Sequence, residues 1–123
     1  MPVERAADHP VHELGGNVIT SLTAPSRGSD ETALFRIVLP PGSGLPPHRH
    51  DHFDAFAVIA GGGTVHLGTE AIEVTEGDSA VVPTGVRHWL DAGPAGVTIL
   101  VTMVAATKLI RDDGSESVPP WVA

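Results

Sequence analysis

The chain has 123 residues, a formal net charge of −8 and no cysteine. This length suits one domain with a single core, and the lack of cysteine excludes disulfides and thiolate chemistry. The acidic balance argues against nucleic-acid and anionic-membrane partners, because both need a basic surface. Any metal site must therefore use nitrogen and oxygen ligands.

The composition favours an all-β protein, with 14 glycines, 11 prolines and many β-branched residues. Apolar residues at helical spacing are interrupted throughout by Gly, Pro or β-branched runs. In chain order, the pattern predicts strands over residues 17–23, 32–39, 55–60, 64–68, 71–75, 79–83, 87–91 and 97–105. Turn-forming segments separate them, among them GGG at 61–63 and DAGPAG at 91–96. Short strands at this spacing indicate an antiparallel sandwich or barrel, such as a jelly roll.

We expect one domain over residues 1–123, with an N-terminal arm at 1–14, a barrel at 15–106 and a C-terminal tail at 107–123. The arm is polar, and its two histidines, His9 and His12, are expected in solvent. The tail ends in a Pro-Pro-Trp patch, and Trp121 is expected to be anchored to its own domain or to a partner subunit.

The first ten residues, MPVERAADHP, lack the apolar segment of a secretory signal. The longest apolar run, residues 96–106, is much shorter than the roughly 20 residues that cross a bilayer. We therefore expect a soluble cytoplasmic protein.

The segment PPHRHDHFDAF at 46–56 concentrates residues that bind metals. Alternate residues of a strand share a face, so His48 and His50 would point the same way and could bind one ion. Further on, His88 follows the turn PTG and begins another predicted strand, from which its ring could return to the same pocket. Together with Asp54 these histidines form a donor set that suits Fe, Mn, Ni, Cu or Zn.

These residues resemble two motifs of the cupin superfamily. Residues 42–61 follow the first motif: Gly, five residues, His, one, His, three, an acid, six, Gly. Residues 77–92 resemble the second: Gly, five residues, Pro, one, Gly, two, His, followed by four residues up to Ala92. Fifteen residues separate the motifs and are expected to form a short hairpin. Two motifs in this order and separation are far more specific than either alone.

The resemblance implies a double-stranded β-helix, or jelly-roll barrel, that holds a divalent transition metal in its mouth. Its ligands would be His48, His50, Asp54 and His88, with Fe or Mn as first choice and Ni, Zn or Cu possible. The family usually has Glu in place of Asp54 and often Asn in place of Ala92. Asp54 could therefore ligate directly, orient a histidine ring or act as a base. Single-domain relatives are commonly dimers, so a homodimer is also expected.

The remaining histidines, two arginines and the large apolar side chains have simpler interpretations. His52 is expected at the pocket rim or outside it, and His66 on the surface or packed. Arg36 would need an anionic partner if it entered the barrel, whereas Arg49 falls on the strand face opposite the neighbouring histidines. Several large side chains could wall a substrate pocket or form simple core: Phe35, Phe53, Phe56, Trp89 and Met103.

The function expected from these residues is that of a metal-dependent enzyme acting on a small oxygen-rich or aromatic molecule, with a dioxygenase as the first hypothesis and Asp54 as the candidate catalytic residue. A redox-neutral isomerase or cyclase is the alternative within enzymes. A non-catalytic module that binds a sugar or an organic acid is the alternative outside them. A cupin without a metal, whose histidines are hydrogen-bonded in a polar cavity, is the simplest competing interpretation.

Overall fold

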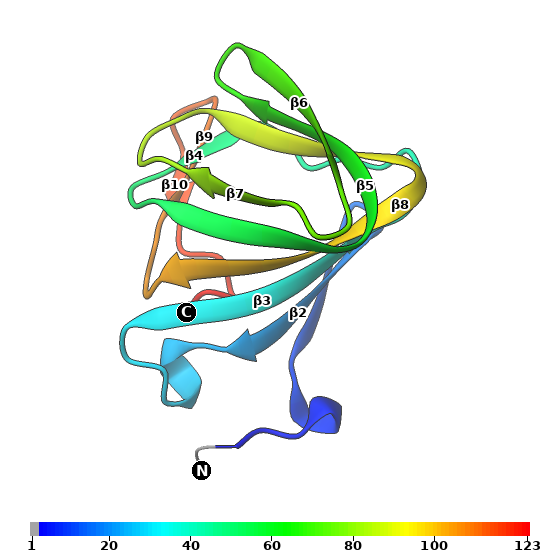
Figure 1. The fold of residues 1–123 in the computed structure, drawn as a ribbon. Coiled ribbons are helices and arrows are strands. Elements are labelled where there is room, and N and C mark those ends of the chain that lie inside the picture. The colour runs from blue at the N-terminus through cyan, green and yellow to red at the C-terminus, as the bar shows by residue number, and fades with distance from the viewer. Residues whose placement is uncertain (1–2) are drawn as a thin grey trace.

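Two long strands organise the fold, which we describe from a computed structural model covering residues 3–123. Strands β5 and β8 pair antiparallel over nearly their whole lengths, and the other strands add to them as a curled sheet (Figure 1). The elements are η1 (Ala6–Asp8), β1 (Val11–Leu14), β2 (Asn17–Thr23), η2 (Pro25–Arg27), β3 (Thr32–Leu39), β4 (His48–His50), β5 (Asp54–Leu67), β6 (Glu70–Thr75), β7 (Ser79–Val82), β8 (His88–Val104), β9 (Leu109–Arg111) and β10 (Glu116–Ser117). The all-β prediction is confirmed.

The strand alternation places the core inside the curl of the sheet. In β3, which matches the predicted 32–39, the side chains of Ala33, Phe35, Ile37 and Leu39 are buried, and the residues between them are more exposed. Across the β3–β8 pairing, alternate residues of β8 are buried in the same way. Arg36 therefore lies on the outer face and does not enter the barrel.

Two predicted turns are wrong, because GGG lies within β5 and DAGPAG lies within β8. The reason is the close approach of the two strands where they bend together. A Cβ atom at Gly61 or Gly63 would overlap a carbonyl oxygen of β8, so glycine is required by the pairing and not by a turn. Register shifts between Val58 and Ala60 and between Gly61 and Gly63 accompany the bend.

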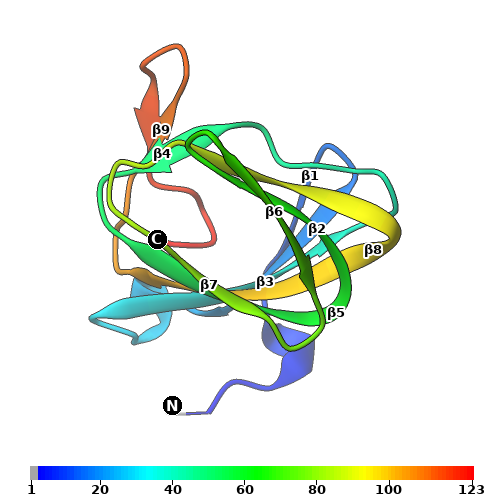
Figure 2. The same cartoon turned by 45° about the horizontal axis from the view of Figure 1, so that its top comes forward.

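Both terminal segments join the sheet. Strand β1 pairs with β2, and β9 in the tail pairs with β4. Beyond them, the Trp121 ring packs near Phe35 and His12, with ring centroids 6.5 Å and 5.8 Å apart, and Val122 is fully buried. Figure 2 shows this C-terminal segment, in red, inside the outline of the curled sheet. Trp121 is thus anchored to its own domain, and His12 is half-buried against it.

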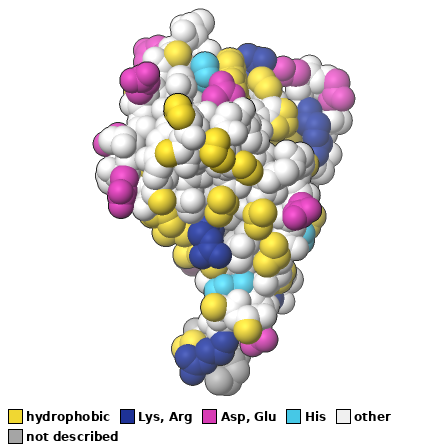
Figure 3. Space-filling view, turned by 90° about the vertical axis from the view of Figure 1, so that its right-hand side faces the viewer, with side chains coloured by type: hydrophobic (Ala, Val, Ile, Leu, Met, Phe, Trp, Pro, Cys, Tyr) yellow, Lys and Arg dark blue, Asp and Glu magenta, His cyan; other side chains and the backbone are white. Residues whose placement is uncertain are grey.

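The outer surface carries both apolar and charged side chains, as one face of the molecule shows in Figure 3. Exposed large hydrophobic residues include Val38, Ile59 and Val81. A homodimer would need an exposed apolar face of this kind. The homodimer itself stays a prediction. Within residues 3–123, no helix has the length and apolar character needed to span a membrane.

Candidate metal centre

Strand β4 brings the two motifs together, because it pairs with β8 and β9 at once. His48 is the register partner of His88, so residues 40 positions apart in the chain lie side by side. His50 is buried, and it follows His48 by two positions on the same face of β4. Arg49 takes the opposite face, as the alternation predicted.

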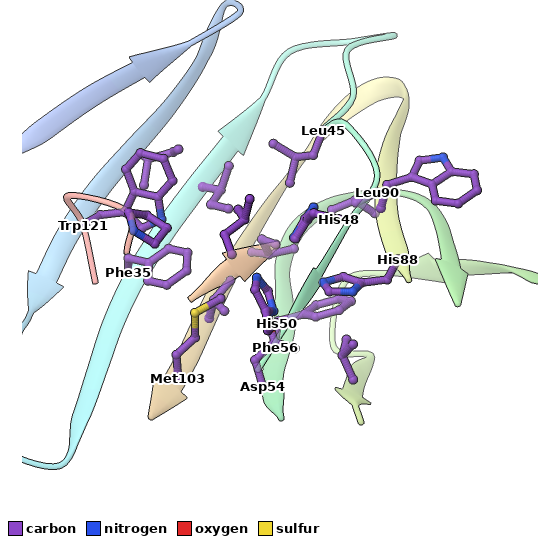
Figure 4. Close-up of a pocket in the computed structure, with 18 of the residues that line it drawn as sticks. Phe35, Leu45, His48, His50, Asp54, Phe56, His88, Leu90, Met103 and Trp121 are labelled. Atoms are coloured by element: carbon purple, nitrogen blue, oxygen red, sulfur yellow. The ribbon is translucent and has the colours of Figure 1, made fainter. Parts of the chain in front are cut away.

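The three histidine rings converge on one another. Ring centroids are 4.3 Å apart for His48 and His88, 4.7 Å for His48 and His50, and 4.9 Å for His50 and His88. One nitrogen from each ring lies within 4.8 Å of the others. Figure 4 shows the rings gathered between the strands, with Asp54 beside His50. Three imidazoles in this arrangement could hold one metal ion.

Backbone carbonyls set the tautomers of two of the rings. Nδ1 of His48 lies 2.8 Å from the carbonyl oxygen of Pro46, and Nδ1 of His88 lies 2.8 Å from that of Val86. A carbonyl oxygen can only accept, so each Nδ1 must donate its proton. The Nε2 atoms of both rings are left with free lone pairs, which is the form that binds a metal.

Burial keeps these imidazoles neutral. Desolvation lowers the pKa of His50 to about 3 and that of His88 to about 4, and it also lowers the pKa of His48. The positive charge that neighbouring rings would carry lowers the pKa of His50 and of His88 further. Neutral rings need no deprotonation before they coordinate a cation, so the donor set fits a divalent transition metal.

Asp54, at the start of β5, lies against His50 and not at the meeting point of the three rings. Its Oδ2 is 3.5 Å from His50 Nδ1, which is too long for a hydrogen bond. Among the described residues, neither His50 Nδ1 nor Asp54 Oδ1 has a hydrogen-bond partner. Burial raises the pKa of Asp54 to about 7. Its carboxyl group can therefore gain or lose a proton near neutral pH, and its role as a metal ligand stays a prediction.

A cavity of about 90 Å³ adjoins the histidines and is lined almost entirely by apolar side chains. Phe35, Phe56, Trp89 and Met103, which the sequence offered as possible walls, do line it. Figure 4 shows Phe35, Phe56 and Met103 around the site. Phe53 does not, because its side chain is 51% exposed.

Some wall residues come from segments that the sequence analysis did not connect with the site. Leu45 lies in the link between β3 and β4, Leu109 lies in β9, and Trp121 lies in the tail. Only Trp121 carried a usable signal, as an aromatic residue in a polar tail. The short strand that holds Leu109 was too brief to detect from alternation.

The other histidines lie outside the cluster. His52 is exposed and pairs with Asp51 at 2.9 Å. His66 stacks on Trp89, with ring centroids 4.3 Å apart and planes inclined by 6°, and its Nε2 lies 2.9 Å from Asp91 Oδ2. The predictions that His52 is at the rim or outside, and that His66 is a surface or packed residue, agree with this arrangement.

Comparison with known proteins identifies the fold and a distant enzyme relative. The family model described as "Cupin domain" matches residues 35–103. Gentisate 1,2-dioxygenase from Haloferax sp. is 40% identical over 57 residues, which are 46% of this chain and 15% of that enzyme. The chain thus corresponds to a small part of the relative's length.

Solved structures show the same fold at low sequence identity. An RmlC-like cupin from Shewanella frigidimarina has a TM-score of 0.72 at 22% identity and covers 82% of this chain and 87% of its own. The polyketide cyclase RemF from Streptomyces resistomycificus has a TM-score of 0.75 at 21% identity, with 85% and 79% covered. A variant of oxalate decarboxylase from Bacillus subtilis has a TM-score of 0.71 at 23% identity, with 78% and 27% covered.

Proposed function

The chain belongs to the cupin family, and on that premise we propose that it is a metal-dependent enzyme that acts as a dioxygenase on a small oxygen-bearing or aromatic molecule. The observation that carries this proposal is the convergence of three neutral histidines at the edge of an apolar cavity. The similarity to a gentisate 1,2-dioxygenase over 57 residues supports it.

The site residues would have two roles, metal binding and proton transfer. His48, His50 and His88 would hold the ion, with two of the rings fixed by their carbonyl partners. A bound metal supplies a Lewis acid and, if it is redox-active, a means of activating dioxygen. Asp54, with a pKa raised to about 7, would accept a proton from a substrate hydroxyl, or from a carbon next to a carbonyl group, near neutral pH. The apolar walls would keep bulk water from the reacting atoms.

A redox-neutral cyclase or isomerase is the second candidate. It is supported by the buried carboxyl group of Asp54, because reactions of this kind need acid–base catalysis but no oxidant. The polyketide cyclase among the similar structures shares the fold over most of both chains. A binding module without turnover, for a sugar or an organic acid, is the remaining alternative.

Elemental analysis of protein made without a histidine tag tests the metal site. We expect close to one equivalent of Fe or Mn, or of Ni, Zn or Cu, in the wild type and almost none in His50→Ala. His52→Ala is the matched control, because it removes an exposed imidazole two positions away. Equal metal content in wild type and His50→Ala would end the metalloenzyme proposal.

Reconstitution then separates the reaction classes. A dioxygenase should consume oxygen in step with substrate and depend on a redox-active metal, whereas a cyclase or isomerase should work without oxygen and accept Zn. Stabilisation by a ligand without any turnover would instead support the binding module.

A further inference from the structure

Strand β4, which carries two of the three histidines, is paired mainly with the C-terminal tail. It pairs with β8 at one position, His48 opposite His88, and the Gly85 N–H donates a hydrogen bond to the His50 carbonyl oxygen. With β9 it pairs at all three of its positions. Strand β9 pairs in turn with β10, and the two form a hairpin that we call the tail hairpin, residues 108–117. Most of the strand pairing of β4 therefore comes from a segment that follows the predicted barrel in the chain.

The tail hairpin depends on β4 in the same way. Among the strands of residues 3–123, β9 pairs with β4 and β10 alone, and β10 pairs with β9 alone. An ion pair also links the hairpin to the start of β8, since Asp112 accepts two hydrogen bonds from Arg87 at 3.0 Å and 2.9 Å. This pair lies at the surface, where such pairs contribute little. The hairpin also lies outside residues 35–103, which match the family model.

Asp51, the residue directly after His50, links β4 to the hairpin. Its Oδ1 accepts a hydrogen bond from the backbone N–H of Lys108 at 2.8 Å, and its own N–H donates to the Lys108 carbonyl oxygen at 3.2 Å. The bond to the carboxylate is charge-assisted and so stronger than a bond between neutral groups. The two bonds close the β4–β9 pairing at the end where His50 lies.

We propose that Asp51 is a positioning residue of the metal centre, which acts through the tail hairpin to keep His48 and His50 beside His88. The inference rests on the proposed function in assigning a metal to these rings. When the hairpin leaves β4, two of the three histidines lose their main strand partner, while His88 stays in the long β5–β8 pairing. Metal binding and hairpin docking therefore favour each other, and each strengthens the other by the same factor.

Lys108 makes the docking of the hairpin measurable, because it is the single lysine of the chain. A lysine-specific protease can cut only there, and it needs a locally opened segment. In metal-free protein we expect Asp51→Ala to be cut about tenfold faster than the wild type, since one charge-assisted hydrogen bond is lost. Asp51→Asn keeps an accepting oxygen and should be cut almost as slowly as the wild type. His52→Ala is the matched control, because it removes the other partner of Asp51 Oδ1 and leaves the bond to Lys108.

Mn²⁺ alone then tests the coupling to the metal centre. At concentrations well above its Kd, Mn²⁺ should slow the cutting of the wild type by about tenfold or more. The Mn²⁺ affinity of Asp51→Ala should be about tenfold lower than that of the wild type, and Asp51→Asn should restore most of it. Gly28→Ala, strained at a φ of +102° in the loop after η2, lowers the stability of the fold away from this junction. It should leave the Mn²⁺ affinity unchanged, which a merely structural effect of Asp51→Ala would also do.

Equal cutting of wild type and Asp51→Ala in metal-free protein would overturn the inference. In a wild type that binds Mn²⁺, an unchanged cutting rate on metal addition, or an equal affinity in Asp51→Ala, would overturn it as well. A wild type that binds no metal would instead overturn the proposed function. Faster cutting of metal-free Asp51→Ala would in that case still show that Asp51 holds β4 to the tail hairpin.

Discussion

Oδ2 of Asp54 lies 3.5 Å from Nδ1 of His50, and the two side chains are 5% and 4% exposed. The carboxyl group of Asp54 thus lies next to the His50 ring, and the His50 ring in turn faces the rings of His48 and His88. In this position it can orient the His50 ring and exchange a proton, without sharing the meeting point of the three rings.

Replacing Asp54 by Asn keeps the side-chain volume but removes the proton exchange. We expect turnover to fall by about 10²–10⁴-fold, the usual range for loss of a general base. Metal affinity should fall by about 10–100-fold at most, as for residues that support a ligand. Steady-state kinetics and metal titration on the same samples measure both. Unchanged turnover in Asp54→Asn would show that this carboxyl group is not the base.

The metal-free protein should lose stability as the pH falls from about 6.5 to 4. The pKa values of His50 and His88 are lowered to about 3 and 4 by burial, so in this range the unfolded chain binds more protons at both. The pKa of His48 is also lowered, which acts in the same direction. Asp54 acts in the opposite direction, because its raised pKa of about 7 makes the folded chain bind the extra proton. The balance favours the unfolded state in acid, with a slope of at least about one proton.

Urea unfolding at several pH values in the presence of a chelator measures this slope. Asp54→Asn should steepen it by about one proton, because the opposing group is gone. His52→Ala, which changes an exposed ring, should leave it unaltered. A free energy of unfolding that is constant over this pH range would contradict the assignment of neutral, buried imidazoles.

Gly63→Ala should destabilise the protein by about 3 kcal/mol or more, since an added Cβ overlaps the carbonyl oxygen of Asp91 and forces β5 away from β8. Gly68→Ala is the matched control in the turn after β5. Its φ of +59° strains an alanine by about 1–2 kcal/mol, but no atom lies near the new Cβ. Thermal or urea unfolding compares the two. Equal losses would show that the strands tolerate separation at this point.

Trp121→Ala should cost about 2–4 kcal/mol, because the half-buried ring packs against Phe35 and His12 at the cavity wall. Phe53→Ala removes an aromatic ring that is 51% exposed and should change stability by less than about 0.5 kcal/mol. Differential scanning calorimetry gives both values. A Trp121→Ala protein as stable as the wild type would mean that the packing of the tail does not stabilise the barrel.

The alternation in residues 32–39 predicted a strand and its buried face correctly, since a side-chain period of two needs no partner to be recognised. The motif spacing likewise indicated that His48, His50 and His88 would meet. The glycine-rich segments were predicted wrongly, because GGG on its own is a typical turn sequence. In the structure these glycines are needed because the backbone of β8, which is distant in sequence, passes too close for a side chain.

What the sequence determined by itself was the class of fold, which follows from the period-two alternation of the strands, and the identity of the converging histidines, which the resemblance to two family motifs implies. The tertiary structure decided where Asp54 lies and which side chains line the cavity. It also decided that, among the described residues, neither Lys nor Arg is one of them. These features arise where separate strands and the tail pack together. Packing of that kind depends on the pairing register and on burial, which no local stretch of the chain contains.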